Sequence, residues 1–392
     1  MKFTQAFFGS AMQDNRRDIY YIGYYAKPAV APSRHAFPSA VTKMDYVMDC
    51  LGRLGYRVIC LSMSPVYRGK AEPKRVVELS SSSRLILLPS AGRRWKLDLP
   101  AQRLLNKFYT AAGVFRTVPR GATVVAYHSL AYSRILRFLK RFKGVRLILE
   151  VEESYSDVSG SMNDSLKEHR IFDAADGFIC SSPTLLEAVD RAGRPSCVAF
   201  GSYLKPERKK TSFGDGRTHA VYSGTFDRRK KGALNAVAAS DYLGKGYAVH
   251  VIGFGSKEDT DELEKLAEDH NRCGGSTVEV LPALYGDEYT AFLQKCDIGL
   301  SSQALDAEFV GTSFPSKILV YLANGLKVVS GRLASIQGTL LESALFLYSE
   351  DDPKAIALCI ENAANNCSSD GDEVLTRLDE EFLADLRCVL SE

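Results

Sequence analysis

A chain of 392 residues, with 45% hydrophobic and 25% charged residues, is long enough for two hydrophobic cores, which predicts two domains. The 50 Lys and Arg residues against 47 Asp and Glu leave a net charge of +3, too balanced to support nucleic-acid binding. Nine scattered cysteines without a C-x-x-C pair are typical of a reducing compartment. No apolar run approaches the roughly 20 residues that span a bilayer, so we expect a cytoplasmic protein, at most attached peripherally to a membrane.

Apolar runs rich in Val, Ile and Leu alternate with helical patterns in the N-terminal half. Residues 39–54 repeat apolar side chains at helical spacing and end at Gly55, and residues 133–142 form a second, basic helical pattern. Because strands and helices that alternate in this way build parallel sheets, we expect an α/β domain. The expected strands are residues 19–25, 57–62, 84–88, 123–127, 146–151 and 177–180.

The pattern breaks at residues 204–218, where Pro, Gly and a run of charges replace the apolar periodicity and indicate a solvated linker. The alternation then restarts, which predicts a second doubly wound domain with ligands at the carboxyl ends of its strands and in the cleft between domains. The expected strands are residues 219–223, 248–253, 277–281, 298–302 and 326–330, and the expected helices are 233–243, 260–270, 287–295 and 315–324.

Residues 312–330, TSFPSKILVYLANGLKVVS, carry the most informative motif. Pro315 suits the first position of a helix, because its fixed φ fits there and its missing N–H loses no bond. The backbone N–H groups of Ser316 and Lys317 then stand at a helix N-terminus, where the Lys317 ammonium and the Ser316 hydroxyl help to cradle a diphosphate. A well-capped amphipathic helix with a solvated lysine is the alternative interpretation.

A second segment, residues 221–232, joins a strand to a helix through small residues and a basic turn. Small residues let a ligand approach the backbone, and cations neutralise a leaving diphosphate. Lys231, next to the helix start, is the preferred cation, whereas a solvated charge run explains Arg228 and Arg229. The candidate ligand contacts here are Ser223, Gly224, Thr225 and Lys231.

A third segment, VHVIGFG at residues 249–255, ends a strand in Gly253-x-Gly255. An isolated G-x-G is also an ordinary tight turn. It indicates a ligand site here because it stands at the carboxyl end of a strand in the same domain, and we therefore add Gly253 and Gly255 to the candidate contacts.

In their order and spacing these segments, with the run 293–300, resemble the C-terminal domain of GT-B-fold glycosyltransferases. The resemblance is to family 4-like (group 1) bacterial enzymes that build capsule, exopolysaccharide or lipid-linked glycans. It covers residues 219–340, and the N-terminal half is similar only in its α/β layout. The resemblance implies two doubly wound Rossmann-like domains facing a central cleft. These are an acceptor-side domain at 1–205 and a nucleotide-sugar domain at 206–372, with a C-terminal helix at 373–392 that packs back on the first domain.

The same resemblance implies the donor-binding residues. Lys231 matches the family lysine on the donor diphosphate, whereas Thr225 stands in the place of the family arginine. Thr312 and Val320 occupy the places of two family glutamates, which leaves the sugar and the stereochemical outcome open, and Lys317 compensates for the lost arginine. The implied donor site consists of Ser223, Gly224, Thr225, Lys231, Gly253, Gly255, Phe314, Ser316, Lys317 and Tyr321.

Carboxylates follow the expected strand 146–151 in the N-terminal half. Such a run is costly to bury unless it faces a polar cleft, where a carboxylate can activate an acceptor hydroxyl as general base. Glu152 is the first candidate and Glu153 the second, although both are also able to hydrogen-bond the acceptor or cap a helix. His128 ends the preceding strand and is a third catalytic candidate, with a purely structural histidine as the alternative.

We therefore expect a glycosyltransferase that moves a sugar from a UDP- or GDP-sugar to a glycan or lipid-linked acceptor hydroxyl in cell-surface polysaccharide synthesis. No D-x-D motif stands at a strand end, so we expect no metal, and the nucleotide-sugar serves as co-substrate in place of a cofactor. The alternatives are a nucleotide-sugar epimerase of the same fold and a catalytically silent scaffold, which the missing glutamates favour. Aromatic and basic residues at 93–120 indicate contact with an anionic membrane, or else solvated helices with an ordinary core face.

Overall fold

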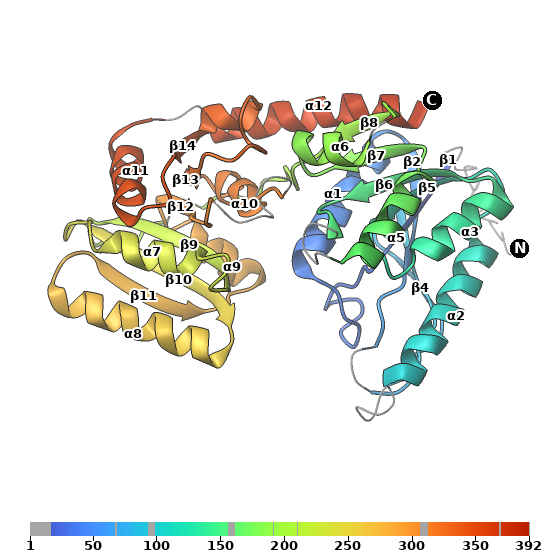
Figure 1. Ribbon diagram of the computed structural model, residues 1–392, viewed down its shortest axis with the longest axis horizontal. Helices are drawn as coiled ribbons and strands as arrows, with labels where there is room; N and C mark the ends of the chain where they lie inside the picture. The colour runs from blue at the N-terminus through green and yellow to red at the C-terminus, as the bar shows by residue number, and fades with distance from the viewer. Residues whose placement is uncertain are drawn as a thin grey trace, which may run out of the picture.

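The computed structural model describes residues 17–391 except 67–68, 93–98, 156–160, 191, 210, 306–312 and 368–369. These residues form two lobes that lie side by side, each with a β-sheet and helices around it (Figure 1). Thr312 and the segment 93–98, which the sequence analysis singled out, lie outside the described residues. Among the helices that are described, none is both long and apolar enough to cross a membrane.

The N-terminal lobe contains an eight-stranded sheet in the order β3-β4-β2-β1-β5-β6-β7-β8, parallel except for the β3–β4 pair. Its central strands form because their side chains are buried on both faces, as in β5, where Val124, Val125 and Ala126 are all inaccessible to solvent. The strands are β1 (Arg17–Gly23), β2 (Tyr56–Ser62), β3 (Arg75–Glu78), β4 (Ser83–Leu87), β5 (Thr123–Tyr127), β6 (Arg146–Val151), β7 (Gly177–Cys180) and β8 (Ser196–Val198). The helices are α1 (Pro38–Arg53), α2 (Leu99–Thr117), α3 (Ser133–Lys143), α5 (Met162–Phe172) and α6 (Pro183–Val189).

The C-terminal lobe contains a six-stranded, wholly parallel sheet in the order β11-β10-β9-β12-β13-β14. Its strands are β9 (Thr218–Phe226), β10 (Tyr247–Gly255), β11 (Thr277–Pro282), β12 (Ile298–Ser301), β13 (Lys327–Gly331) and β14 (Leu345–Tyr348). Its helices are α7 (Gly232–Ser240), α8 (Lys257–Cys273), α9 (Gly286–Leu293), α10 (Lys317–Ala323), the 3-10 helix η3 (Leu340–Ala344) and α11 (Pro353–Asn365).

Both sheets reverse their strand order beside their first strand. In the N-terminal sheet β1 lies between β2 and β5, and in the C-terminal sheet β9 lies between β10 and β12. In a doubly wound sheet the helices on either side of such a point diverge, which leaves a crevice at the carboxyl ends of the strands. The fold therefore places one candidate crevice after β1 and another after β9.

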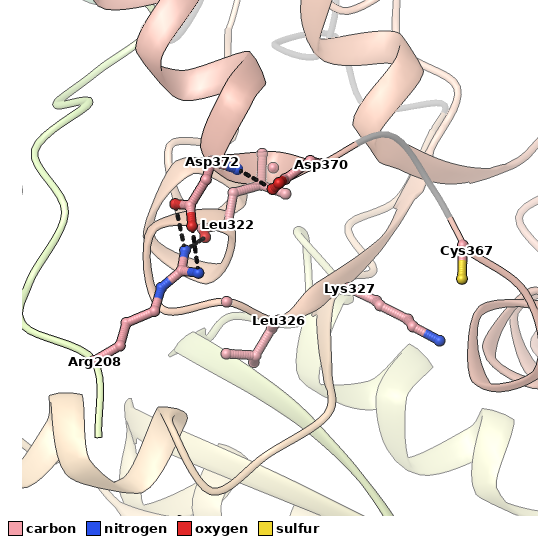
Figure 2. A pocket seen from close by; sticks show the side chains of 9 residues that line it. Arg208, Leu322, Leu326, Lys327, Cys367, Asp370 and Asp372 are labelled. Carbon is pink, nitrogen blue, oxygen red and sulfur yellow. Dashed lines mark hydrogen bonds and ion pairs between the residues drawn. The ribbon is translucent and has the colours of Figure 1, made fainter. Parts of the chain in front are cut away.

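The segment between β8 and β9 is tied to the C-terminal lobe by Arg208. Its guanidinium makes two 2.7 Å hydrogen bonds to the Asp372 carboxylate and a 2.9 Å bond to the carbonyl oxygen of Leu322 on α10. Figure 2 shows these groups beside a cavity of about 220 Å³. Arg208 and Asp372 thus neutralise each other's charge at this cavity.

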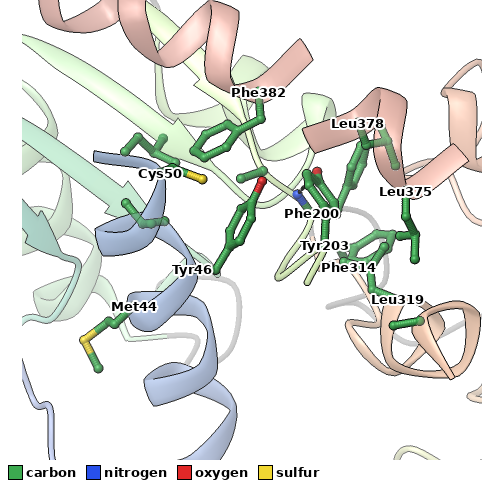
Figure 3. Packing of buried hydrophobic residues seen from close by; sticks show 14 of the residues in the cluster. Met44, Tyr46, Cys50, Phe200, Tyr203, Phe314, Leu319, Leu375, Leu378 and Phe382 are labelled. Atoms are coloured by element: carbon green, nitrogen blue, oxygen red, sulfur yellow. Dashed lines mark hydrogen bonds between the residues drawn. The ribbon is translucent and has the colours of Figure 1, made fainter. Parts of the chain in front are cut away.

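Helix α12 (Gly371–Ser391) crosses both lobes along one edge of the molecule (Figure 1). Tyr46 of α1 packs against Phe382 of α12 and against Tyr203 of the segment after β8, with ring centroids 5.6 and 5.2 Å apart (Figure 3). The Tyr46 hydroxyl and the Arg53 guanidinium donate to the Asp379 carboxylate at 2.6 to 2.9 Å. The lobes are thus joined by an aromatic cluster with an ion pair at its side.

Most expected elements are present with end shifts of one to three residues. The helix expected from Pro315 begins at Lys317, and the helix expected over 39–54 spans Pro38–Arg53. The sequence analysis did not anticipate the antiparallel strand β3, helices α5 and α6, strand β8 or the final β14–α11 unit.

Candidate active site

Lys317, the first residue of α10, lies over the crevice beside β9. Its Nζ is 4.0 Å from the centroid of the Tyr222 ring, and a Cβ built on Gly224 would lie only 3.1 Å from this Nζ. No carboxylate of the described residues pairs with it. Burial, reinforced by the charge of Lys230, lowers the pKa of Lys317 to about 7. A desolvated ammonium without a counter-ion is an environment that an anionic ligand would stabilise.

Lys230, the neighbour of the expected Lys231, lies within electrostatic reach of Lys317. Lys231 occupies the left-handed region, with φ 54°, immediately before α7, and its carbonyl oxygen accepts the Asn235 N–H at 2.8 Å. The role of Lys231 at the donor diphosphate stays a prediction. Arg228 bonds to Asp259 and Glu262, as expected for a surface charge.

The N-terminus of α7 adds a second positive feature to this crevice. The helix has no acidic residue in its first turn and no side-chain cap, so its first backbone N–H groups keep their partial positive charge. Gly232 begins the helix directly beside Tyr222, and a Cβ there would lie 2.6 Å from the ring. Glycine is therefore required for α7 to approach β9 closely.

Ser223 of β9 and Tyr321 of α10 are hydrogen-bonded to each other at the base of the crevice. The Ser223 N–H donates to the Tyr321 hydroxyl at 2.8 Å, and the Ser223 hydroxyl lies 2.6 Å from the hydroxyl of Tyr289. Tyr321 is fully buried and its ring fills the space above Gly299, where a Cβ would lie 2.2 Å from it. Tyr321, expected at the donor, instead positions Ser223 from the interior.

Gly253 and Gly255 also have a different position from the expected one. Both lie within β10, which continues through Gly255 in register with β9. A Cβ on Gly253 would lie 1.8 Å from the carbonyl oxygen of Gly224, and one on Gly255 would lie 2.7 Å from Cβ of Phe226. These glycines allow β10 to pack closely against β9 next to the crevice. They lie in a strand and do not form a turn around a ligand.

The remaining donor candidates lie around the start of α10. Phe314 is 8% exposed and packs on Phe200 with ring centroids 4.9 Å apart, which places it in the junction between lobes (Figure 3). Ser316 is exposed at the N-cap of α10 and makes no side-chain cap bond. Thr225 is exposed at the end of β9, and its carbonyl oxygen accepts the Tyr222 hydroxyl at 3.1 Å. Val320, in the place of a family glutamate, is partly buried on α10.

In the N-terminal lobe the carboxylates after β6 meet a buried lysine. Lys43 of α1 is 4% exposed and lies 3.2 Å from Glu152 Oε1, and its Nζ donates to the carbonyl oxygen of Ala199. The Glu152 side chain is one quarter exposed, so it both pairs with Lys43 and reaches solvent. Burial raises the pKa of Glu152, which favours a proton acceptor over a permanently charged group. Glu153 is exposed beside it.

Glu150 is the inner member of this carboxylate group. It is fully buried and accepts the Tyr21 hydroxyl, while its Oε1 has no hydrogen-bond partner among the described residues. Burial, followed by the charge of Glu152, raises the pKa of Glu150 to about 8. Glu150 is therefore protonated at neutral pH.

Replacing Glu150 with glutamine should remove part of the pH dependence of stability. The folded state keeps the Glu150 proton up to about pH 8 and the unfolded state releases it near 4.5, so wild-type stability falls across this window as pH rises. At pH 9 the E150Q variant should be more stable by on the order of 2 kcal/mol, and at pH 5 it should match wild type. Urea denaturation at both pH values measures this, with exposed Glu153→Gln as control. An equal effect of E150Q at both pH values would contradict the assignment.

His128 is held in the interior, contrary to a catalytic role. It is 3% exposed and its Nε2 lies 2.9 Å from Glu168 Oε1 on α5. Glu168 also accepts the backbone N–H of Tyr155 at 2.9 Å. Glu168 on α5 therefore binds both the segment after β5, through His128, and the segment after β6, through Tyr155. These contacts support the structural interpretation of His128.

A cavity of about 470 Å³ lies at the carboxyl ends of β1 and β2, with α2 as one wall. Three of its lining residues, His35, Arg103 and Lys107, are basic, and no carboxylate is found among the described residues that line it. The remaining lining residues are Tyr24, Met63, Pro65, Val66, Leu99, Gln102, Asn106, Thr110, Ala131, Tyr132 and Ile135. A ligand with an apolar part and a negative charge suits this lining.

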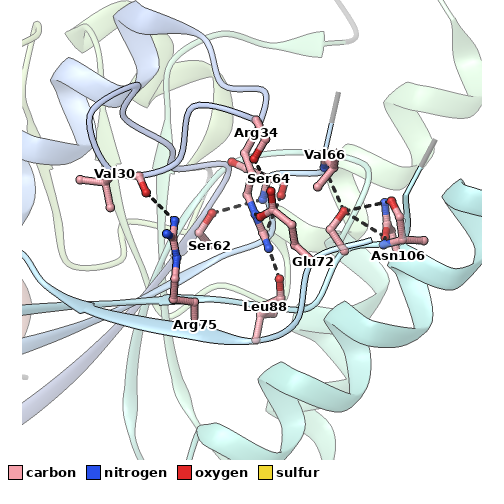
Figure 4. A network of polar contacts seen from close by, with 12 residues as sticks. Val30, Arg34, Ser62, Ser64, Val66, Glu72, Arg75, Leu88 and Asn106 are labelled. Atoms are coloured by element: carbon pink, nitrogen blue, oxygen red, sulfur yellow. Dashed lines mark hydrogen bonds and ion pairs between the residues drawn. The ribbon is translucent and has the colours of Figure 1, made fainter. Parts of the chain in front are cut away.

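Arg34 fixes the loop that forms one wall of this cavity (Figure 4). Its buried guanidinium donates to Glu72 at 3.0 Å and to the carbonyl oxygens of Ser64 and Leu88 at 3.1 and 2.7 Å. A buried charge with three partners holds the backbone firmly, because moving it would leave charged groups unpaired. The neighbouring residue His35 is thereby held at the cavity.

Four polar residues of these sites were not candidates in the sequence analysis. Lys43 interrupts the apolar face of α1, and a lysine at a buried helical position was the available signal. Lys230 stands next to Lys231 in a basic turn, and the sequence offered no signal that distinguishes the two. Arg103 and Lys107 are four residues apart and so share one face of α2, but no sequence feature connected that face with the ends of β1 and β2.

Comparison with known proteins gives likenesses in structure only. No model of a known protein family matches the sequence, and a search of curated protein sequences gives no match. A sucrose-phosphate synthase from Thermosynechococcus elongatus superposes with a TM-score of 0.67 at 16% identity, covering 96% of this chain and 97% of that one. Trehalose-6-phosphate synthase from E. coli bound with UDP-2-fluoro glucose gives 0.66 at 10%, covering 94% and 96%. A UDP-forming α,α-trehalose-phosphate synthase from Burkholderia xenovorans, in complex with glucose-6-phosphate, gives 0.64 at 11%, covering 96% and 100%.

At these identities the likeness is one of fold, and the fold is GT-B, with two Rossmann-like domains. The three structures named above are sugar-phosphate synthases, so they give no support to a capsule or exopolysaccharide subtype. The likeness therefore supports the GT-B architecture without the narrower resemblance to family 4-like enzymes.

Proposed function

We propose that this chain is a glycosyltransferase that takes a sugar from a nucleotide-diphosphate sugar bound at the crevice after β9. The observation that carries the proposal is the Lys317 ammonium, desolvated and without a carboxylate partner among the described residues, beside Lys230 and the N-terminus of α7. Charge that develops on a leaving diphosphate would be stabilised there by groups already in position. The neighbour bound with UDP-2-fluoro glucose has the same fold, which supports a nucleotide-sugar donor.

The acceptor is proposed to bind in the N-terminal lobe, in the cavity lined by α2 and the ends of β1 and β2. Its basic and apolar lining favours an acceptor with a phosphate and an apolar body, such as a lipid-linked glycan of polysaccharide synthesis. A neighbour in complex with glucose-6-phosphate supports the phosphate part. Glu152 is proposed to hydrogen-bond the acceptor hydroxyl and accept its proton, with Lys43 holding the carboxylate in place.

Domain bounds near residues 205 and 372 are consistent with this proposal, in which each domain binds one of the two substrates. No metal is part of the proposed mechanism, because the two lysines and the α7 N–H groups supply the positive charge. Lys317 supports a nucleotide site, which a silent nucleotide-binding scaffold would share, so activity has to be tested separately.

A thermal-shift panel of UDP, GDP, UDP-glucose and GDP-mannose tests the donor site. Wild type should be stabilised by one nucleotide class, because a ligand that binds only the folded state raises the melting temperature. Lys317→Ala should lose this shift and the exposed Lys245→Ala should keep it. No shift with any nucleotide would refute the donor site, and release of free sugar from the recognised donor would separate an enzyme from a scaffold.

The same site predicts how nucleotide affinity depends on pH. Lys317 must be protonated to bind a diphosphate, and its pKa of about 7 means that binding takes up a proton at higher pH. The affinity should therefore fall about tenfold per pH unit above pH 7. Lys317→Arg stays charged, so its affinity should be nearly constant between pH 7 and 9. Isothermal titration in buffers of different ionisation enthalpy measures the proton uptake, and a pH-independent wild-type affinity would contradict it.

A further inference from the structure

Helices α2 and α3 lie next to each other on the side of the N-terminal lobe away from the C-terminal lobe (Figure 1). Their shared surface exposes aromatic rings that contact one another, with centroids 5.5 Å apart for Phe115 and Phe138 and 4.3 Å apart for Phe138 and Phe142. Leu104 and Phe108 are 71% and 66% exposed on the same helix as Phe115. So many large apolar side chains at one place mark an interaction surface.

Basic residues are interspersed with these apolar ones. The two helices contain eight Lys and Arg and no Asp or Glu, whereas the whole chain has a net charge of only +3. Lys140 pairs with Asp176, and Lys143 donates to the carbonyl oxygen of Val118. The other six pair with no described carboxylate and are exposed. We call this surface the α2–α3 face, and it consists of Leu104, Phe108, Phe115, Phe138 and Phe142 with Arg103, Lys107, Arg116, Arg134, Arg137 and Arg141.

This combination fits an anionic lipid bilayer better than it fits another macromolecule. Helices that lie in a membrane interface bury aromatic and aliphatic side chains while Lys and Arg contact the lipid phosphates. Long basic side chains extend outward from the helix and leave the apolar residues free to insert.

The face is continuous with the cavity of the N-terminal lobe. Arg103 and Lys107 belong to both, and Ile135 lines both the cavity and a smaller hollow of about 170 Å³ between α2 and α3. A molecule held in a bilayer beneath the face would reach the cavity along α2. The structure thus offers one surface for attachment and an adjoining cavity for a substrate.

We propose that the α2–α3 face docks this protein on a bilayer containing anionic phospholipid, and that the acceptor enters the adjoining cavity from that bilayer. The second part rests on the proposed glycosyltransferase function, whereas the docking itself does not. Attachment would hold α2 at the lipid surface and leave the C-terminal lobe in solution, where nucleotide-sugars are dissolved.

Vesicle flotation with the full chain tests the docking. The protein should float with vesicles of phosphatidylcholine containing about 30% phosphatidylglycerol, and should not float with phosphatidylcholine alone. Added salt should release it, because part of the attraction is electrostatic. No flotation with the anionic vesicles, or equal flotation with both kinds, would overturn the proposal.

Matched variants separate the face from the rest of the surface. Arg137→Glu with Arg141→Glu, and separately Phe138→Ser with Phe142→Ser, should each lower the vesicle partition coefficient by about tenfold or more. The control is Lys265→Glu with Leu266→Ser on α8, an exposed basic and apolar pair in the C-terminal lobe. Unchanged partitioning of both face variants would refute the assignment. A nucleotide thermal shift equal to that of wild type would show that the variants fold, and would distinguish failed docking from a failed donor site.

Discussion

Replacing Lys317 with methionine should make the ligand-free protein more stable and abolish its stabilisation by nucleotide. The lysine is held with a pKa of about 7, because burial disfavours its charge. Methionine fills a similar volume without a charge, so the variant should gain roughly 2 kcal/mol at pH 6.5, a figure reduced from the full pKa shift because the side chain is partly exposed. Urea denaturation with and without UDP measures both effects.

The pH dependence of this gain has a definite sign. The unfolded chain keeps the Lys317 proton up to about pH 10.5, whereas the folded protein releases it near pH 7. Wild-type stability from this residue therefore rises between these values, and the advantage of K317M should shrink from pH 6.5 to pH 9. A variant less stable than wild type at pH 6.5 would show instead that Lys317 has an anionic partner in the folded chain.

Replacing Gly253 with alanine should destabilise the C-terminal lobe strongly. The new Cβ would lie 1.8 Å from the carbonyl oxygen of Gly224 and 2.8 Å from the Phe226 ring, and the first of these is backbone that moves only with its strand. We expect a loss of roughly 3 kcal/mol, at the upper end for overpacking. Nucleotide affinity should fall as well, because Gly224 lies directly beneath Lys317.

The control for this substitution is Gly246→Ala, where a Cβ would meet nothing within 4 Å. Its unfolding free energy should change by less than about 0.5 kcal/mol. If G253A unfolded like wild type but lost nucleotide binding, Gly253 would be a ligand contact as the sequence predicted. The measurement therefore decides between a packing role and a binding role for this residue.

The α/β architecture was accessible from the sequence because strands buried on both faces produce continuous apolar runs between helical patterns. The run at 123–127 is such a case, and the strand there has these bounds. The antiparallel β3 was not accessible, since only its pairing with β4 at the sheet edge makes an otherwise exposed segment a strand.

Residues of the candidate site could be placed from the sequence only where the neighbouring residues in the chain determine where a side chain lies. The position of Lys317 at the start of a helix could be predicted, because a loop and a proline precede an apolar stripe at helical spacing. The proximity of Lys230 to Lys317 could not be predicted, because it depends on the turn before α7, where Lys231 is left-handed. The role of His128 depends on Glu168, which is 40 residues away, and no local pattern connects the two.

Helix α12 also has a consequence for how the chain folds during synthesis. It packs against β7 and β8, and its Leu390 carbonyl oxygen accepts a 2.9 Å bond from Arg146 of β6. Yet α12 leaves the ribosome after every strand of both sheets. Strands β7 and β8 therefore lack the cover of α12 until the whole C-terminal lobe has been translated. During this period their exposed apolar surface is available to a chaperone.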